Sequence, residues 1–448
     1  MNYSILTYGC QMNARDSEVI AGLLEGAGYA RATDIEQADV IVVNTCCVRE
    51  TAERRILGRL GDLKRLKRDN PSLVIAVGGC MAQQEGVSDR IRRSYPHVDV
   101  VFGTFNLHEL PDLIRESRAR KRRLFEVHPC DRMEWGCEGP VVSRRAAGVS
   151  AFVTVMYGCN NFCSYCVVPY VRGREVSRDA RAVVAEVEEA VSLGFKEVML
   201  LGQNVNSYGK GVQGGTGFAG LLAMVDGVRG VERIRYMTSH PRDFGEDIIR
   251  SVAESSHVCE HFHLPVQAGS NRVLRLMNRG YTREYYMDLI DRVREAVPGA
   301  SVTTDLIVGF PGETEADFVD TLDLVRRVRF DMAYTFMYSP RRGTRAAAME
   351  GQVPLDERRR RLSALTGEVN PIALSLNERL VGNAVEVLVE GPSEKNPRVA
   401  TGRTRTNKVV LISGGSPRAG ELVDVRITRA RTWTLEGELP KEGFPQGR

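Results

Sequence analysis

The chain has 448 residues, of which 43% are hydrophobic and 26% charged, with a formal net charge of +4. These values are typical of a globular protein of two to four domains, and the small net charge does not by itself indicate a nucleic-acid binder. No apolar run approaches the roughly 18 residues of a membrane span, and no signal peptide opens the chain, so we expect a cytoplasmic protein without a membrane partner.

Residues 1–115 alternate between β-prone runs and amphipathic helical spacing. The β-prone runs cover 3–7, 40–43 and 73–77, and three residues after each run stands a cysteine: Cys10, Cys46 and Cys80. This alternation predicts an α/β domain with a parallel sheet, whose carboxyl edge is where ligands bind in open sheets. We therefore expect these three thiols to converge in space, although buried packing cysteines are the plain alternative.

Residues 116–148 interrupt this alternation. The run at 115–123 has six basic residues and one acidic residue, and no sustained period follows it. We interpret the segment as a basic linker that carries at most a short strand. The alternative is a solvated helix end, because most charge runs are solvated surface.

Residues 149–371 return to the alternation of strands and helices. Six strands are predicted, at 152–156, 197–201, 234–238, 261–264, 302–308 and 333–338. Six β/α units indicate a partial (β/α)6 barrel, since a complete barrel has eight units and roughly 250 residues. Directly after the first of these strands come Cys159, Cys163 and Cys166, at the end of the barrel where active sites lie.

The C-x3-C-x2-C spacing of these three cysteines is the strongest chemical signal in the chain. Soft thiolates suit iron–sulfur clusters, and a short loop can place three of them on a 4Fe–4S cube whose fourth iron stays open to a small molecule. A structural zinc site needs four ligands, and no fourth Cys or His stands nearby. His240, His261 and His263 raise zinc again, but single histidines near strand ends are more often hydrogen-bonded core residues.

Residues 372–440 change in composition. Short alternating strands are predicted at 385–389, 399–402, 409–412 and 422–427, joined by Gly, Pro and Asn turns. Between Arg379 and Arg431 there are ten Lys or Arg and five Asp or Glu, a local excess of five positive charges. A small basic β-barrel of OB-like type favours an RNA partner, with Arg403, Arg405 and Lys408 as the candidate contacts.

Nearly the whole chain resembles one enzyme family. Three segments resemble the N-terminal domain of methylthiotransferases: YGCQMNARDSE (8–18), VVNTCCVRE (42–50) and VGGCMAQ (77–83). Six resemble their radical S-adenosylmethionine (SAM) core: YGCNNFCSYCVVPYVRGREVSR (157–178), LLGQNVNSYG (200–209), TSHPRDF (238–244), HLPVQAGSNRVLRLMNRGYTREYY (263–286), TDLIVGFPGETEADF (304–318) and YSPRRGTRA (338–346). Two resemble a TRAM domain, an RNA-binding barrel: EGPSEKNP (390–397) and TGRTRTNKVV (401–410).

The resemblance implies SAM and two 4Fe–4S clusters as cofactors. One cluster, on Cys159, Cys163 and Cys166, would cleave SAM, and the other, on the three strand-end cysteines, would hold the sulfur to be inserted. GCQMN and CVVPY are similar to the MiaB type, which implies methylthiolation of C2 of N6-isopentenyladenosine next to the anticodon of tRNA, with two SAM molecules. The partners implied are tRNA and an electron donor such as flavodoxin or ferredoxin, with a monomeric chain.

Further site residues follow from the same resemblance. Tyr165 is placed to face the SAM adenine, with packing as the alternative, and Gln203 and Asn204 end the second barrel strand where SAM's amino group binds in relatives. Asp305 is a candidate for the SAM pocket. Arg172 and Arg174 are read either as contacts to RNA phosphate or as surface ion pairs.

Three alternatives stay open at this stage. Sibling methylthiotransferases act on threonylcarbamoyl-adenosine in tRNA or on a ribosomal protein, and a non-catalytic iron–sulfur protein that binds RNA or senses redox state would use the same scaffold. Both triads leave an open iron, which favours an enzyme. The chain departs from the family beside its motifs, where Asp179, Arg342 and Arg345 replace usual prolines. Cys47 adjoins Cys46; we assign Cys46 as the ligand because it holds the family position, and Cys47 as a core thiol.

Overall fold

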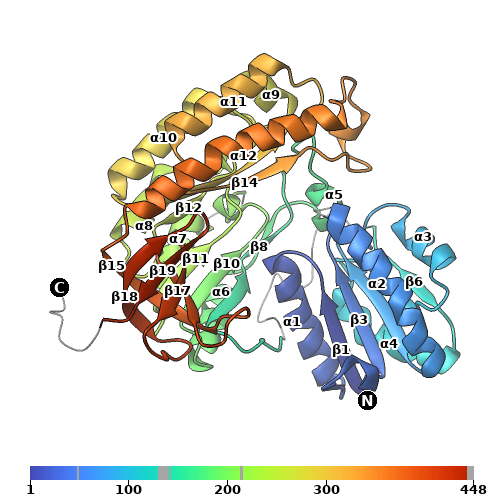
Figure 1. Ribbon diagram of the computed structural model, residues 1–448. Helices are drawn as coiled ribbons and strands as arrows, with labels where there is room; N and C mark the ends of the chain where they lie inside the picture. The colour runs from blue at the N-terminus through green and yellow to red at the C-terminus, as the bar shows by residue number, and fades with distance from the viewer. Residues whose placement is uncertain (48–49, 130–140, 142, 212–214, 441–448) are drawn as a thin grey trace.

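The computed structural model describes residues 1–47, 50–129, 141, 143–211 and 215–440, without the side chains of 50–54, and it has three domains (Figure 1). The N-terminal α/β domain lies beside a central β/α domain, and a small β-barrel at the C-terminus lies on the far side of that central domain. Within the described ranges, no helix has the length and apolarity that crossing a membrane requires.

The N-terminal domain is built on a six-stranded parallel sheet in the order β2-β1-β3-β4-β5-β6. Its strands are β1 (Asn2–Thr7), β2 (Ala30–Arg31), β3 (Val40–Thr45), β4 (Val74–Gly79), β5 (Val100–Phe102) and β6 (Leu124–Glu126), and its helices are α1 (Gln11–Gly26), α2 (Glu50–Asp69), α3 (Val87–Ser94) and α4 (Leu110–Arg120). Side chains of one strand alternate between the two faces. Val40 and Val42 pack with α1 and α4, whereas Ile41 and Val43 pack with α2 and α3. The three strands predicted here are confirmed.

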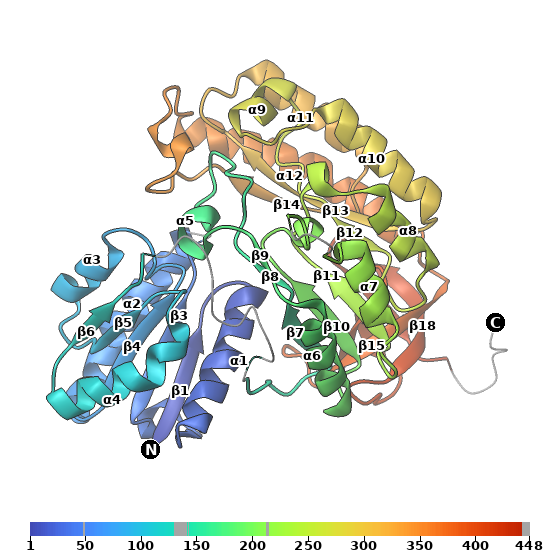
Figure 2. The same cartoon turned by 180° about the vertical axis from the view of Figure 1, so that it is seen from behind.

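The central domain is the predicted partial barrel. One parallel sheet contains β7 (Ser150–Thr154), β10 (Glu197–Leu201) and β11 (Arg233–Tyr236), and another contains β12 (His261–His263), β13 (Ser301–Val308) and β14 (Met332–Met337). A parallel bridge between Ile234 and Val258 connects the two sheets. The outer helices, seen in Figure 2, are α6 (Ala180–Ser192), α7 (Phe218–Asp226), α8 (Glu246–Glu254), α9 (Asn271–Leu276), α10 (Arg283–Ala296) and α11 (Glu315–Val328). All six predicted strands are present.

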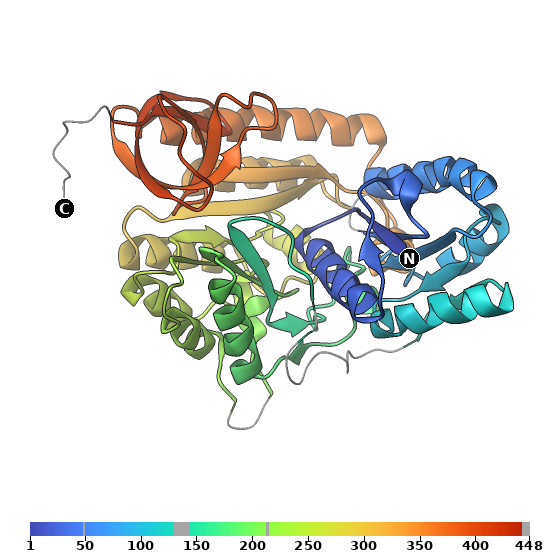
Figure 3. The same ribbon diagram turned by 90° about the horizontal axis from the view of Figure 1, so that it is seen from below.

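The C-terminal domain is a closed barrel, seen end-on in Figure 3. Helix α12 (Leu355–Glu378) leads into it, and its strands are β15 (Ala384–Pro392), β16 (Ala400–Thr404), β17 (Val409–Ser413), β18 (Leu422–Ala430) and β19 (Thr434–Glu438), in the order β15-β16-β17-β19-β18. This confirms the small β-barrel that the sequence predicted. It docks on the amino-terminal ends of the core strands, where Arg233 at the start of β11 donates to the carbonyl of Arg403 at 2.6 Å.

The structure differs from the sequence prediction at three boundaries. The first six residues of the basic run expected in a linker (115–120) form the second half of α4, so the alternative of a helix end holds there. Arg118 and Arg120 in its last turn stabilise the carbonyl end of the helix dipole, and β6 then adds a sixth strand to the sheet. Helix α12 crosses the boundary placed at 371, because Pro371 sits inside the helix instead of ending it. The fifth barrel strand, β19, was not predicted, since its sequence TLEGE has too few apolar residues to alternate clearly.

Candidate active site

The first triad, Cys159, Cys163 and Cys166, lies on a loop at the carboxyl end of β7. The loop is closed at its base by an antiparallel pair of short strands, β8 (Met156–Tyr157) and β9 (Val176–Ser177), and carries the short helix α5 (Val168–Arg172). Gly158 has a φ of 73°, and a Cβ there would lie 1.9 Å from the carbonyl oxygen of Arg174. The position therefore requires glycine. Beside it, the Cys159 amide donates to Gly173 O at 3.0 Å, which fixes the start of the triad.

The thiols of this triad are buried together. Burial, together with the neighbouring Cys163, raises the pKa of both Cys159 and Cys166 to about 12. Such thiols are protonated at neutral pH, so a bound metal ion would have to displace their protons. The guanidinium of Arg279, itself buried, donates to Cys163 Sγ at 3.3 Å and supplies positive charge where a cluster with thiolate ligands would carry negative charge.

The second triad, Cys10, Cys46 and Cys80, gathers at the carboxyl edge of the N-terminal sheet. Cys10 is the N-cap of α1 after β1, and Cys46 and Cys80 follow β3 and β4 directly. A Cβ on Gly9 would lie 2.6 Å from Cβ of Cys46, so a glycine is needed where the chain passes between these cysteines. A hydrogen bond from Cys46 lowers the pKa of Cys10 to about 6, although partial desolvation opposes the shift.

Cys47 also reaches this site. Its thiol shares a hydrogen bond with Cys80 that lowers the pKa of Cys80 and raises that of Cys47, which is buried among core residues of the N-terminal domain. The ligand assignment of Cys46 over Cys47 stays a prediction. Cys259 is a buried thiol beside Arg235 in the core domain, far from both triads in the fold, and Cys130 and Cys137 lie outside the described residues.

Helix α5 connects the loop of the first triad to the N-terminal domain, which carries the second triad. Helix α5, which begins two residues after Cys166, inserts Val167 and Val171 into the hydrophobic core of the N-terminal domain. The hydroxyl of Thr104 donates to Val171 O at 2.6 Å. Arg172, read from the sequence as a possible RNA contact, is only 3% exposed and donates to Cys80 Sγ at 3.1 Å. The two predicted cysteine groups are thus brought to one interface by α5.

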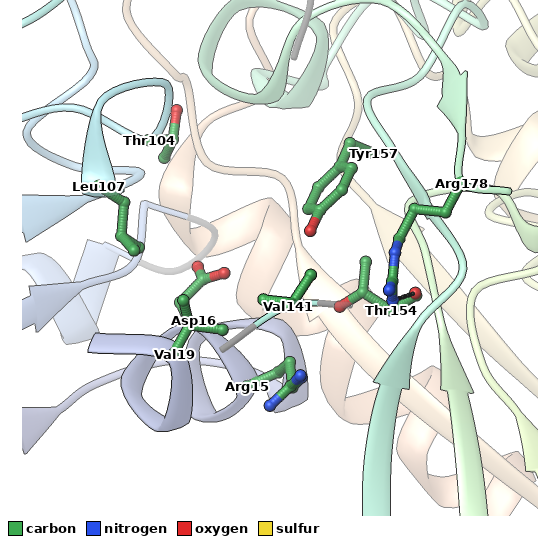
Figure 4. Close-up of a pocket in the computed structure, with 9 residues that line it drawn as sticks. All are labelled: Arg15, Asp16, Val19, Thr104, Leu107, Val141, Thr154, Tyr157 and Arg178. Carbon is green, nitrogen blue, oxygen red and sulfur yellow. Dashed lines mark hydrogen bonds between the residues drawn. The ribbon is translucent and has the colours of Figure 1, made fainter. Parts of the chain in front are cut away.

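A small enclosed cavity of about 20 Å³ lies at this interface (Figure 4). Its lining comes from α1, from the barrel strands and from the loop after β5: Arg15, Asp16, Val19, Thr104, Leu107, Val141, Thr154, Tyr157 and Arg178. This volume holds about one water molecule, so the cavity is no substrate site. Asp16, which forms an ion pair with Arg172, is part of the wall of this cavity.

The residues predicted to bind SAM lie around the first triad in different roles. Tyr165 accepts a hydrogen bond from Arg279 at 3.4 Å and is half-buried against apolar side chains of the barrel. Gln203 accepts from the amide of Gly158 at 2.6 Å, so it supports the cysteine loop. Asn204 donates to Asp243 at 2.9 Å, and Asp305 faces His263 with 3.8 Å between Oδ2 and Nε2.

Several buried polar atoms near these residues have no hydrogen-bond partner in the described part of the chain: Asn204 Oδ1, Ser239 Oγ and both ring nitrogens of His240, whose Nδ1 lies 4.0 Å from Asp243 Oδ2. Burial lowers the pKa of His240 to about 2, so its ring is neutral there. Buried polar groups are normally hydrogen-bonded, and a set of orphans at the carboxyl ends of β10 and β11 indicates a place for a polar ligand. Sequence reasoning treated His240 only as a core residue; His261 and His263 are hydrogen-bonded to Thr303, as expected of core histidines.

The residues predicted to contact RNA from the C-terminal barrel are engaged elsewhere. Arg405 forms a bidentate pair with Glu260 of the core domain at 2.7 and 2.9 Å, and it also donates to the carbonyls of Ser256 and Val258. Lys408 pairs with Asp331 of the core at 2.7 Å. Arg403 pairs within the barrel with Glu390. Two of the three therefore fasten the barrel to the core, and RNA contact by these residues stays a prediction.

A second basic surface was not predicted. A groove of about 1260 Å³ runs between α3, α5 and the loop after β14, and we call it the arginine groove after five arginines in its lining: Arg90, Arg93, Arg174, Arg341 and Arg342. Glu85 is the one acidic residue among its described lining residues. Tyr170, on its wall, is 55% exposed and meets Phe162 edge to face, and Arg174 lies over the ring of Phe162. The walls begin just beyond the last cysteine of each triad, at Ala82 and Val167.

Comparison with known proteins places this geometry among relatives. Residues 153–325 match the Radical SAM superfamily, residues 2–103 match the Uncharacterized protein family UPF0004, and residues 378–439 match the TRAM domain. The chain is 57% identical over 441 residues to the tRNA-2-methylthio-N(6)-dimethylallyladenosine synthase of Moorella thermoacetica, covering 98% of each chain. It is 53% identical over 446 residues to the protein of the same name from Syntrophomonas wolfei, covering 99% of this chain and 98% of that one.

Solved structures agree at the level of the fold. The radical S-adenosylmethionine methyltransferase TsrM from Kitasatospora setae, solved with cobalamin and a 4Fe–4S cluster, aligns with a TM-score of 0.58 at 17% sequence identity. The alignment covers 77% of this chain and 76% of TsrM. At that identity the likeness concerns the arrangement of strands and helices alone.

Proposed function

Since the chain belongs to the family of tRNA-2-methylthio-N6-dimethylallyladenosine synthases, which are radical SAM methylthiotransferases, we propose that it works with two 4Fe–4S clusters, one on each cysteine triad. It is an enzyme that methylthiolates C2 of N6-isopentenyladenosine in tRNA, and its superfamily uses SAM and a 4Fe–4S cluster. Each triad offers three soft ligands and leaves the fourth iron of a cube without a protein ligand.

One observation carries the two-cluster proposal: the two triads share an interface. The first triad, Cys159, Cys163 and Cys166, lies at the carboxyl end of the barrel, and the second gathers at the carboxyl edge of the N-terminal sheet. Helix α5 belongs to the loop of the first triad and contacts Cys80 of the second through Arg172. Two reactive groups so placed can both reach one adenine.

The residues present fit clusters and SAM. Arg279 and Arg172 each donate to one triad sulfur, which offsets the negative charge that thiolates bring. The unpartnered polar atoms of Asn204, Ser239 and His240 offer hydrogen bonds to the polar end of SAM beside the first triad. When bound, these groups supply the one-electron chemistry and the sulfur; the protein orients them and excludes water.

We also infer that the arginine groove receives the RNA. Its arginines outnumber its one acidic residue, so phosphates are attracted, and the exposed ring of Tyr170 offers a stacking surface for an unpaired base. The groove opens beside both triads, which is where a flipped adenosine would have to enter. The substrate position next to the anticodon, a flavodoxin or ferredoxin as electron donor, a cytoplasmic location and a monomeric state are parts of the same proposal.

The test is an assay of the reconstituted enzyme. Anaerobic reconstitution should load about eight irons, and Cys163→Ala or Cys80→Ala should each hold about four. Both variants should fail to form the 2-methylthio product on an anticodon stem-loop with isopentenyladenosine, but only Cys163→Ala should lose SAM cleavage. Cys259→Ala, the same change at a buried thiol outside the triads, should keep eight irons and full activity. About four irons in the unaltered protein would contradict the two-cluster proposal.

A second RNA tests the substrate. A stem-loop with threonylcarbamoyl-adenosine should give little product, because a pocket for a five-carbon apolar group offers no partner to a carboxylate. Equal turnover of both RNAs would contradict the proposed substrate and leave the radical SAM assignment standing.

A further inference from the structure

Arg172 is a buried cation that connects the two cysteine triads. It is the last residue of α5, its side chain leaves the core domain, and it is 3% exposed. Its Nε donates to Cys80 Sγ at 3.1 Å, and its Nη2 donates to Asp16 Oδ2 at 2.5 Å. An arginine buried to this degree needs compensating negative charge, and here one carboxylate and one sulfur provide it.

The backbone around Arg172 is held by the first triad. The next residue, Gly173, accepts a hydrogen bond from the Cys159 amide at 3.0 Å. Val171, the residue before, accepts from Thr104 of the N-terminal domain and packs in that domain's core. The backbone that carries Arg172 is therefore held on both sides, and its guanidinium is oriented by its hydrogen bonds to Cys80 and Asp16.

The other triad has a matching arrangement. Arg279 donates to Cys163 Sγ at 3.3 Å and is held by the carbonyl of Pro265 at 2.6 Å and the hydroxyl of Tyr281 at 3.1 Å. That arginine comes from the same domain as its cysteine. Arg172 differs because it crosses the domain interface, so the second site is completed by a residue of the radical SAM core.

We propose that Arg172 is a positioning residue that donates an N–H···S hydrogen bond to the cluster ligand Cys80 and raises the reduction potential of the cluster on the second triad. Reduction adds one electron to a cluster that is already negative, and no bond is made or broken. A fixed positive charge and an N–H donor at a ligand sulfur stabilise the reduced form more than the oxidised form. The proposal rests on the two-cluster function above.

The experiment is a redox titration of the full chain in which Cys159, Cys163 and Cys166 are all replaced by Ala, so that only the second triad holds iron. Dithionite supplies the electron, and electron paramagnetic resonance follows the reduced cluster. Arg172→Gln should lower the ratio of reduced to oxidised cluster at a fixed potential about tenfold, which is a shift of about 59 mV to more negative values for one electron. Arg172→Lys keeps the positive charge but loses the planar guanidinium, so its reduction potential should lie between those of the parent and of Arg172→Gln.

The control is Arg174→Gln, two residues further on, which removes an exposed arginine that lies over Phe162. It should leave the potential unchanged. A potential of Arg172→Gln equal to that of the parent, with full iron, overturns the proposal. If Arg172→Gln does not hold its cluster, the Lys variant decides: a lowered potential supports the proposal and an unchanged one overturns it. A parent without any iron would instead refute the second cluster itself.

Discussion

Glu186 is the residue whose replacement tests the domain interface most directly. Its carboxylate lies on α6, is almost fully buried, and accepts from three arginines: Arg15 of α1 at 2.7 Å, Arg145 before β7 at 2.9 Å and Arg178 after β9 at 2.7 Å. One buried anion thus ties the N-terminal domain and the segment before the barrel to the base of the cysteine loop. We expect Glu186→Gln to weaken this interface.

The magnitude follows from what remains after the change. Arg15 keeps Glu18 at 3.1 Å, and Arg178 keeps the carbonyl of Thr154 at 2.6 Å, so neither guanidinium is left without a partner. Charge-assisted hydrogen bonds contribute about 1.5–3 kcal/mol each to stability, so a simple sum over three would overestimate the loss. Removal of one member of a buried ion pair typically costs about 3–5 kcal/mol of stability. Because Gln keeps one acceptor, we expect about 3 kcal/mol.

The assay is hydrogen exchange of the α6 amides by mass spectrometry, which reports the opening of that helix without a two-state assumption for three domains. Protection in α6 should fall roughly a hundredfold, since 1.4 kcal/mol is tenfold. Glu188→Gln, the same change on the exposed face of α6, should change it by less than about 0.5 kcal/mol. Equal protection in the two variants would refute the reasoning.

The effect should also depend on pH. Burial opposes ionisation of Glu186, but the attraction of Arg15, Arg178 and Arg145 outweighs it, and the pKa is lowered from 4.5. A carboxylate with a depressed folded-state pKa stabilises the fold fully above its unfolded-state pKa and loses this contribution as pH falls through the folded value. The difference in α6 protection between the parent and Glu186→Gln should therefore be constant near neutral pH and shrink below about pH 4.5.

Three further experiments test separate parts of the site. In anaerobic reconstitution Cys46→Ala should lose about half the iron while Cys47→Ala keeps it, and the reverse result would make Cys47 the ligand. Gly158→Ala should remove the iron of the first triad and abolish SAM cleavage, because the new Cβ would overlap the carbonyl of Arg174; full iron would contradict this. In filter binding, Arg342→Ala should weaken the binding of stem-loop RNA. It should also reduce the slope of binding affinity against salt concentration by about one phosphate contact, whereas Arg405→Ala should leave that slope unchanged. The opposite pattern would assign RNA docking to the C-terminal barrel.

That the cysteines of the second triad share one sheet edge was predictable from local pattern, but that pattern left packing cysteines as an alternative, and the role as cluster ligands was implied by the family resemblance. Each of these cysteines, Cys10, Cys46 and Cys80, follows a β-prone run at the same interval, and parallel strands bring their carboxyl ends to one edge. The same reasoning located the first triad after β7. These inferences needed only the periodicity of side chains and the handedness of crossovers, which short stretches of sequence carry.

Pairings between distant charges were not predictable. Arg172 and Asp16 are 156 residues apart, and Arg405 and Glu260 are 145 apart, so spacing gives no sign that they meet. Both arginines were therefore read as surface residues available to RNA. This interpretation is reasonable for most arginines, because most are exposed. It fails at domain interfaces, where the positive charge of an arginine from one domain is neutralised by a carboxylate of another.

This failure changes where RNA contact should be sought. The excess positive charge of the C-terminal barrel is partly neutralised by Glu260 and Asp331 of the core, and the barrel docks at the amino-terminal ends of the core strands, opposite the triads. Helix α12 runs between the loop side of the core and the barrel (Figure 1), and its 24 residues span about 36 Å. The triads and the docked face of the barrel therefore lie at opposite ends of the core strands. The arginine groove lies at the same end as the triads, which supports the proposal that it receives the anticodon loop while the barrel contacts parts of the tRNA that lie farther away.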